Sequence, residues 1–489
     1  MKIVAAVASF LIASAAYAAP IDYEGARHLL NRAGFGATDA EVRQYARLER
    51  NEAVERLLAG ARREPSIQPP AFVDAPFEPY YRLRRMSAEE RKAAQRRLVE
   101  QGFEMRAWWM REMVATPSPL TERMTLFWHG HFATSQQKVR ASQLMYRQNA
   151  LLRREALGNF ATLLHAVAKD PAMLVYLDNA ANRKQAPNEN FAREVMELFT
   201  LGEGRYGEQD VKEAARAFTG WSLDRETGEF TFRRMWHDYG DKTVLGKTGP
   251  FDGDQVIDVL LARPEAAEFI AAKLWREFVS REPDRREVAR WAGVFRDARY
   301  EVKPLLRAIL TSQAFWSAEN RGVLIKSPVD LIVGTLRTFD IHPMDLRPAV
   351  FAAAALGQNP FSPPNVKGWP GGEAWINSTT LLGRKQWLDR VFRGSDPAMM
   401  VAQRAGGDEA QKDQEKARGE RYRRMMERAM ADYTFDGERF IRSLPVSTDG
   451  AARVDSLVLA ATAVNLAPED ADAAERVRVL VSDPAYQLK

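Results

Sequence analysis

The sequence predicts a mainly α-helical protein, built as one large multi-helix domain with a small β-hairpin insertion. Apolar residues recur at three- and four-residue spacing through most of the chain, between Ser, Asn or Pro residues that begin helices and Gly residues that end them. Strand-like alternation is clear only at about residues 229–246. The chain has no cysteine, so packing and not disulfide bonds must stabilise this fold.

Helix boundaries can be placed from local signals. Ser118 followed by Pro119 has the form of an N-cap and a first helical position. Asn188 or Asn190 caps a later helix that Gly202 ends. Other helices are expected at about residues 82–100, 208–218, 264–278, 302–311, 328–339 and 349–356.

The strand signals are two short runs, residues 230–232 (Phe-Thr-Phe) and residues 243–245 (Thr-Val-Leu). A turn containing Gly240 separates them. Such runs around a turn predict a hairpin inserted between helices.

The N-terminus carries the parts of a secretory signal peptide. Lys2 precedes an apolar run at residues 3–13, and Ala16-Tyr17-Ala18 is a small-x-small cleavage site. We therefore expect residues 1–18 to be a signal peptide and the mature protein to be periplasmic or secreted. The alternative is an uncleaved anchor or a buried first helix. No later apolar run reaches membrane-spanning length, so no transmembrane span is expected.

The mature chain is expected to have three parts. A main helical domain covers residues 19–393, and residues 394–419 form a charged linker or insertion that is poor in large apolar residues. Residues 420–489 form C-terminal helices that pack on the main domain.

Composition excludes several function classes. The 70 basic residues are nearly balanced by 65 acidic ones, which indicates a mixed surface and no nucleic-acid partner. Thiol catalysis and thiolate metal sites are excluded because there is no cysteine. A metal site, if there is one, must use His, carboxylate or carbonyl ligands.

The first candidate site is His129-Gly130-His131, within an aromatic string. Two residues at this spacing point apart on a helix but to one side of an extended segment. If Gly130 ends the helix, both imidazoles converge and can bind a metal. The alternative is two histidines that are hydrogen-bonded to the backbone near an aromatic core.

The second candidate site is the helix that begins near Asn188. Asn190, Arg193, Glu194 and Glu197 fall on one face, and Glu189, Arg193 and Glu197 form an i, i+4 ladder. One interpretation is a surface salt-bridge ladder. The other is a paired-carboxylate face for acid–base catalysis or metal binding.

The third candidate site is the loop that carries His237, Asp238 and Lys242 at the expected hairpin turn. These ionisable groups exceed what a simple turn needs, and loops often carry function. Ordinary turn chemistry is the alternative.

A fourth feature is a long loop in which Trp369 and Trp375 flank Pro-Gly-Gly, with Asn365 and Lys367 close by. An exposed Trp beside Asn can stack on a sugar or bind a partner. Alternatively, a buried Trp holds the long loop in place.

Seven strings occur in order along the chain, at residues 28–38, 126–135, 188–202, 214–221, 237–246, 356–358 and 364–370. Their order resembles the large bacterial family catalogued as domain of unknown function 1800, from about His28 to Leu488. The resemblance implies a mostly helical exported protein and supplies no established reaction. Members often sit beside a sulfatase-like family, which implies an exported sulfatase-like partner protein and work on an envelope polymer. The family's strings contain His129, His131, Glu189, Glu194, His237 and Asp238.

These clusters suggest a periplasmic or secreted hydrolase acting on a polysaccharide or another envelope polymer. Glu194 is the expected base, with His237 and Asp238 beside it as acid or ligand. Substrate binding is assigned to Arg193, Asn190, Lys242, Trp369 and Asn365, and a divalent metal to His129, His131 and Glu189. The alternative is a non-catalytic protein that binds an envelope glycan or partner, with the polar strings fixing the fold.

Overall fold

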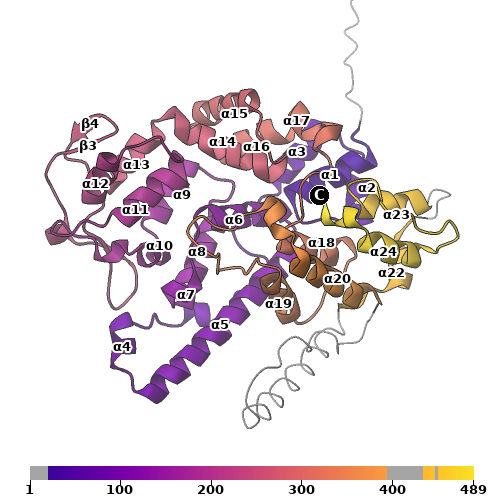
Figure 1. Ribbon diagram of the computed structural model, residues 1–489, viewed down its shortest axis with the longest axis horizontal. Coiled ribbons are helices and arrows are strands. Elements are labelled where there is room, and N and C mark those ends of the chain that lie inside the picture. The colour runs from indigo at the N-terminus through magenta and orange to yellow at the C-terminus, as the bar shows by residue number, and fades with distance from the viewer. Residues whose placement is uncertain (1–19, 394–432, 446–449) are drawn as a thin grey trace, which may run out of the picture.

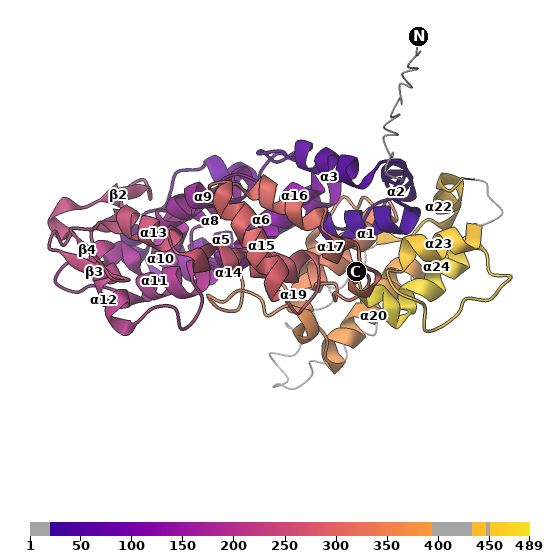
Figure 2. The same cartoon turned by 90° about the horizontal axis from the view of Figure 1, so that it is seen from above.

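The computed structural model describes residues 20–393, 433–445 and 450–489 (Figures 1 and 2). The prediction of a mainly α-helical protein with little β-structure is confirmed. Among the described residues, no helix is both long and apolar enough to cross a bilayer. The predicted signal peptide and the charged segment 394–419 lie outside the described residues.

The N-terminal part forms five helices: α1 (Tyr23–Ala33), α2 (Asp39–Tyr45), α3 (Arg50–Ala59), α4 (Tyr80–Arg85) and α5 (Ala88–Ala115). The charged helix expected at residues 82–100 is therefore two helices, and the second is longer than predicted. Ser87 begins α5 with a capping box, because its side chain accepts from the Glu90 N–H and Glu90 reaches back.

The centre of the molecule is built on α6, which begins at Pro119 with Ser118 as its N-cap residue, as predicted. This part contains α6 (Pro119–His131), α7 (Gln136–Val139), α8 (Ser142–Arg154), α9 (Phe160–Ala168) and α10 (Pro171–Tyr176). The Trp128 ring stacks with Phe132 and Phe160, at 5.9 and 5.6 Å between centroids. Since these three rings are fully buried, α6 is fixed in the core.

The second candidate string also forms a helix. Asn188 is its N-cap, α11 (Glu189–Glu194) follows, and the chain then widens into a π-helical turn at Val195–Thr200. After Gly202 the next helix is α12 (Glu208–Ala217).

The predicted single hairpin is wrong in its pairing. The strand β2 (Phe230–Phe232) pairs with β1 (Trp221–Leu223), and β3 (Lys242–Val244) pairs with β4 (Lys247–Gly249). The second pair is closed by Leu245 and Gly246, which both have positive φ, as a two-residue type I′ turn requires. The two predicted strands thus belong to two separate antiparallel ladders.

The α-helices that follow these strands are α13 (Gly253–Leu261), α14 (Pro264–Phe278), α15 (Arg285–Asp297), α16 (Val302–Leu310), α17 (Gln313–Trp316), α18 (Pro328–Thr338), α19 (Arg347–Ala355), α20 (Ser378–Arg393), α22 (Gly437–Ser443), α23 (Gly450–Val458) and α24 (Ala473–Ser482). Figure 1 shows α22 to α24 at the opposite end of the molecule from β3 and β4. The Phe392 ring of α20 contacts Phe339 and Phe435, and its carbonyl oxygen accepts from Nε of Arg478 on α24 at 3.1 Å. These contacts join the C-terminal helices to the main body.

Candidate active site

The two histidines of the first candidate string point to different sides of α6, because the helix continues through His131. The Nε2 atom of His129 accepts from the Phe361 N–H at 3.1 Å. The Nε2 atom of His131 lies 3.2 Å from the Phe199 carbonyl oxygen, and its Nδ1 lies 2.9 Å from Lys273 Nζ. The expected convergence of the two imidazoles is therefore wrong.

Burial keeps both imidazoles neutral. It lowers the pKa of His129 to about 3, and with the nearby Lys273 charge it lowers the pKa of His131 well below its usual value. The third predicted metal ligand, Glu189, instead lies 3.5 Å from Arg193 on the surface. Across the described ranges, no group of three His, Cys, Asp or Glu side chains is placed to hold a metal ion. The predicted set His129, His131 and Glu189 is not assembled.

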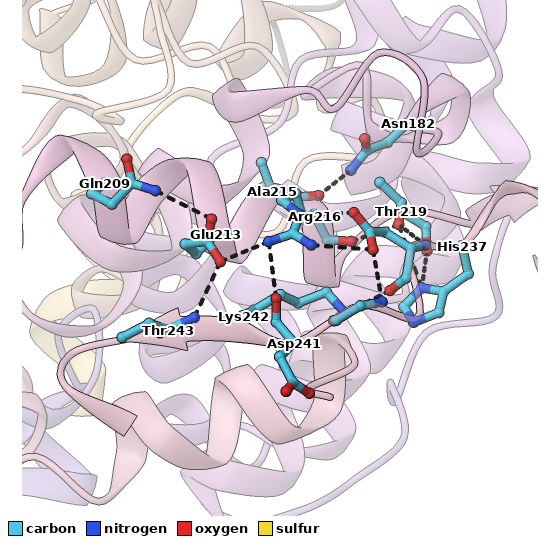
Figure 3. A network of polar contacts seen from close by, with 12 residues as sticks. Asn182, Gln209, Glu213, Ala215, Arg216, Thr219, His237, Asp241, Lys242 and Thr243 are labelled. Carbon is cyan, nitrogen blue, oxygen red and sulfur yellow. Dashed lines mark hydrogen bonds and ion pairs between the residues drawn. The ribbon is translucent and has the colours of Figure 1, made fainter. Parts of the chain in front are cut away.

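The third candidate loop is tied to α12 by a polar network (Figure 3). His237 Nδ1 lies 2.8 Å from the Thr219 carbonyl oxygen, and the Asp238 carboxylate accepts from Arg216 Nε at 2.7 Å. Lys242 Nζ donates to the Asp238 and Gly240 carbonyl oxygens, at 2.5 and 2.9 Å.

This network fixes the backbone of the loop. Hydrogen bonds from Arg216 lower the pKa of Asp238, so the carboxylate stays charged. His237 and Lys242 are both buried. Within the described part of the chain, their hydrogen bonds go to main-chain oxygens and to the Thr219 hydroxyl, and none goes to Glu194. No hydrogen bond or ion pair between described residues joins this loop to Glu194 or Glu197, so the predicted catalytic set is not linked by direct contacts.

The substrate-binding residues predicted on α11 also make internal contacts. Arg193 donates to both carboxylate oxygens of Glu208, at 2.7 Å each. Asn190 is exposed, and its amide donates to the Leu177 carbonyl oxygen at 3.3 Å. The predicted ladder is split, because Arg193 pairs with Glu189 and Glu208 while Glu197 binds elsewhere.

The long loop contacts the end of α6. Gly368 has φ +80°, and a Cβ there would collide with the Gly130 carbonyl oxygen. Trp369 is half-buried, with its ring centroid 5.5 Å from that of His129. Trp375 is buried, whereas Asn365 is exposed and accepts from the Lys367 N–H. Both tryptophans therefore help to hold the loop in place.

The structure brings together a different set of groups around the π-helical turn. Glu197 accepts from the Tyr206 hydroxyl at 2.7 Å, and Lys367 Nζ lies 3.9 Å from it. Lys367 also lies 3.3 Å from the exposed Glu203. Glu194 is half-buried and within electrostatic range of Glu197 and Lys367. The Glu194–Glu197 pair, Tyr206 and Lys367 form the candidate site.

The two carboxylates of this site have different surroundings. Burial raises the pKa of Glu194, and the Glu197 charge raises it further against the opposing effect of Lys367 and Arg193. No described residue donates a hydrogen bond to the Glu194 carboxylate, whereas Glu197 has the Tyr206 hydroxyl. Such an arrangement favours the neutral form of the Glu194 carboxyl group.

The π-helical turn sets this geometry. The Leu201 N–H donates to the Met196 carbonyl, and the Thr200 hydroxyl donates to the Val195 carbonyl at 2.7 Å. Below the turn, Lys273 donates to the Leu198 carbonyl as well as to His131. π-Bulges inside helices are frequent at functional sites, and this one lies directly after Glu194.

Sequence reasoning found Glu194 and Glu197 but missed Tyr206 and the approach of Lys367. Tyr206 lies in a short loop between helices, where no periodicity marks it. Lys367 comes from a segment 170 positions further along the chain than Glu197, so only the fold could reveal the contact. The glycine-rich loop around Gly368 was a usable signal, because positive φ and close backbone approach both require glycine.

The fold and the site together define a multi-helix protein with a paired-carboxylate site at a π-helical turn. The chain belongs to the family described as "Protein of unknown function (DUF1800)", whose sequence model matches residues 28–488. Searches of curated proteins and of solved structures give no match.

Proposed function

We propose that this protein is an exported hydrolase that acts on an envelope or extracellular polymer, with Glu194 and Glu197 as its acid–base pair. The supporting observation is the difference between the two carboxylates. Glu194 is half-buried, carries a raised pKa and has no hydrogen-bond donor among the described residues, whereas Glu197 binds Tyr206. Neighbouring titratable groups with different surroundings are typical of acid and base assignments.

The raised pKa changes the role assigned to Glu194 from base to acid. Glu194 donates its proton to the leaving oxygen as the linkage breaks. Glu197 takes a proton from the attacking water, whose oxygen forms the new bond to the electrophilic centre. The leaving group has then gained a proton and the electrophilic centre a hydroxyl group, which together account for one water. The proton on Glu197 returns to Glu194 through solvent.

The loop around Lys367 supplies the proposed substrate contacts. Lys367 is exposed beside Glu197, and the exposed Asn365 accepts from the Lys367 N–H. A lysine there can bind an anionic or hydroxyl-rich polymer. The long loop and α11 are therefore the proposed walls of the binding surface. Periplasmic or secreted location remains part of the proposal and depends on cleavage after Ala18.

The direct test is a screen of the mature full-length protein against envelope polysaccharides and ester-linked polymers, with products identified by mass spectrometry. On a substrate that is cleaved, Glu194→Gln and Glu197→Gln are each expected to lower kcat about 100-fold or more. Glu189→Gln on the same helix is the matched control and should retain activity, because the ion pair of Glu189 within the described ranges is with Arg193 and not with the carboxylate site. Unchanged turnover in Glu194→Gln would remove the assigned role.

The pH profile separates the acid role from a structural one. A group that must be protonated gives a rate that falls as pH rises through its pKa. We expect this alkaline limb of kcat in the wild-type protein and its absence from the residual activity of Glu194→Gln. A limb that persists in the variant would assign it to another group.

A second function is favoured by the internal bonding of the other predicted residues. His129, His131 and Asp238 are all bound within the fold, which suits a non-catalytic glycan- or partner-binding protein. In that case the mature protein binds a polymer, or an exported sulfatase-like partner, without releasing products. Equal polymer binding by wild type and Glu194→Gln, with no product from either, would favour this function over hydrolysis.

A further inference from the structure

A narrow pocket, lined by none of the residues of the carboxylate site, lies between α1, α18 and the C-terminal segment. Asn31 of α1 lines one side, and Lys326 precedes the N-cap of α18. Asp330, Tyr486 and Lys489 complete the polar part of the wall. Because the interior is narrow, it suits a small ion or the terminal group of a larger molecule.

The acidic group of the pocket is already neutralised. Asp330 accepts from Arg123, from Lys489 Nζ at 2.8 Å and from the Ser327 N–H at 3.0 Å. Although burial raises the pKa of Asp330, the charges of Arg123 and Lys489 lower it well below its usual range on balance. Asp330 is therefore a buried anion whose oxygens are committed to these partners.

Lys326 has no such partner. Its Nζ makes no hydrogen bond to any residue that the structure describes, and it lies 3.7 Å from the Tyr486 ring centroid. Its main-chain carbonyl accepts from Arg384 and its N–H donates to the Gln487 carbonyl oxygen, which fixes the residue in place. The result is an amino group held at the pocket wall with a free donor.

Positive side chains are in excess around this pocket. The buried carboxylate Asp330, the half-buried Glu277 and the main-chain carboxylate of Lys489 face six basic side chains, namely Arg27, Arg32, Arg123, Lys326, Arg384 and Lys489. An anion bound near Lys326 would reduce this excess in a region with little water, where charge interactions are strong. The Asn31 side chain, which has no hydrogen-bond partner among the described residues, adds a second donor.

We infer that this pocket binds a tetrahedral oxyanion, a sulfate or a phosphate, through Lys326 and Asn31. The oxyanion is either free or the terminal monoester group of a larger molecule. Both ends of the region matched by the family model meet here, since Asn31 lies near its start and Tyr486 near its end. The inference is independent of the proposed hydrolase.

Binding should depend on pH. Burial, aided by Arg27, Arg384 and Lys489 and opposed by Asp330, lowers the pKa of Lys326 to about 7. A bound anion favours the charged ammonium, so binding is accompanied by proton uptake. Since sulfate keeps its charge across this range, its affinity should fall as pH rises from 6 to 8.

The test is calorimetric titration of the mature protein with sodium sulfate at constant ionic strength, set with chloride. We expect saturable binding that is at least tenfold weaker in Lys326→Met, while Lys385→Met, an exposed lysine on α20, binds as wild type does. Thermal unfolding provides a second readout. Sulfate stabilises proteins generally by exclusion from their surface, so specific binding is measured as the extra stabilisation of wild type over Lys326→Met. Equal stabilisation of wild type and Lys326→Met would overturn the inference.

A second variant protects the test if Lys326→Met does not fold. Asn31→Asp is nearly isosteric and adds a negative charge at the pocket, so it should abolish sulfate binding. Sulfate affinity equal to wild type in Asn31→Asp would contradict the inference. Glycerol phosphate and inorganic phosphate distinguish the two sources: binding of both indicates a monoester group, and binding of inorganic phosphate alone indicates a free ion.

Discussion

The buried ion pair between Glu122 and Arg153 anchors α6 and should respond strongly to loss of one charge. Arg153 Nε and Nη2 donate to the two oxygens of Glu122 at 2.6 and 3.0 Å, and the Trp109 indole donates to Glu122 at 2.8 Å. The side chains of Glu122 and Arg153 are 2% and 1% exposed. The change Glu122→Gln keeps this shape and removes only the negative charge.

The expected magnitude follows from burial. Burial lowers the pKa of Arg153, but Glu122 raises it on balance, so the guanidinium stays charged after the change and loses its counter-ion. Removing one partner of such a buried pair typically costs about 3–5 kcal/mol of folding free energy. Replacing both, in Glu122→Leu/Arg153→Met, removes the buried charge as well, and we expect a stability within about 2 kcal/mol of wild type.

Urea denaturation followed by tryptophan fluorescence measures these differences. Glu55→Gln is the matched control, because Glu55 pairs with Arg307 at the surface, where such pairs contribute less than about 1 kcal/mol. A loss below about 1 kcal/mol in Glu122→Gln would refute the reasoning. So would a double variant that is less stable than the single one.

Two further predictions concern the long loop and a pH-dependent contact. Gly368→Ala should destabilise the protein by about 2–4 kcal/mol, since it adds backbone strain and a clash with α6. Gly371 also has a positive φ, but an added Cβ there meets no atom within 4 Å, so Gly371→Ala should cost only about 1–2 kcal/mol. Equal losses of stability in urea denaturation would contradict the contact between the loop and α6. His165 bridges Asp254 and Asp258, and its hydrogen bond to Asp254 raises its pKa against the effect of burial. The stability from this bridge is present below pH 6.5 and is lost as pH rises through the raised pKa of His165. The melting temperature of His165→Gln should therefore lie further below that of wild type at pH 5.5 than at pH 8. The same difference in melting temperature at both pH values would contradict a role for the charged imidazole.

Local sequence signals predicted the helices well and the strand pairing poorly. The caps at Ser118 and Asn188 are read from adjacent residues, and both begin helices as expected. The run at residues 230–232 was recognised as a strand, but its partner was not. A strand gains stability only from a neighbour, and β1 before it has three residues, too few for their apolar–polar alternation to mark a strand.

The candidate site was predicted in part. Glu194 and Glu197 were identified because helical spacing puts charged residues on one face. Their division into a half-buried carboxyl and a paired one depends on Tyr206 and Lys367, which reach the π-helical turn from other segments. The histidines were expected to act with these carboxylates, but His131 is bound by the Phe199 carbonyl and Lys273, and His237 is bound by the Thr219 carbonyl.

The sequence by itself determined the helical class, several helix starts, the family and the residue types available for chemistry, because spacing and capping act over a few neighbouring residues. Only the tertiary structure decided which of those residues are free to react. Burial, hydrogen-bond partners and nearby charge come from segments far apart in the chain. They turn His129 and His131 into neutral core residues, Asp238 into a structural anion, and Glu194 into the carboxyl group with a raised pKa.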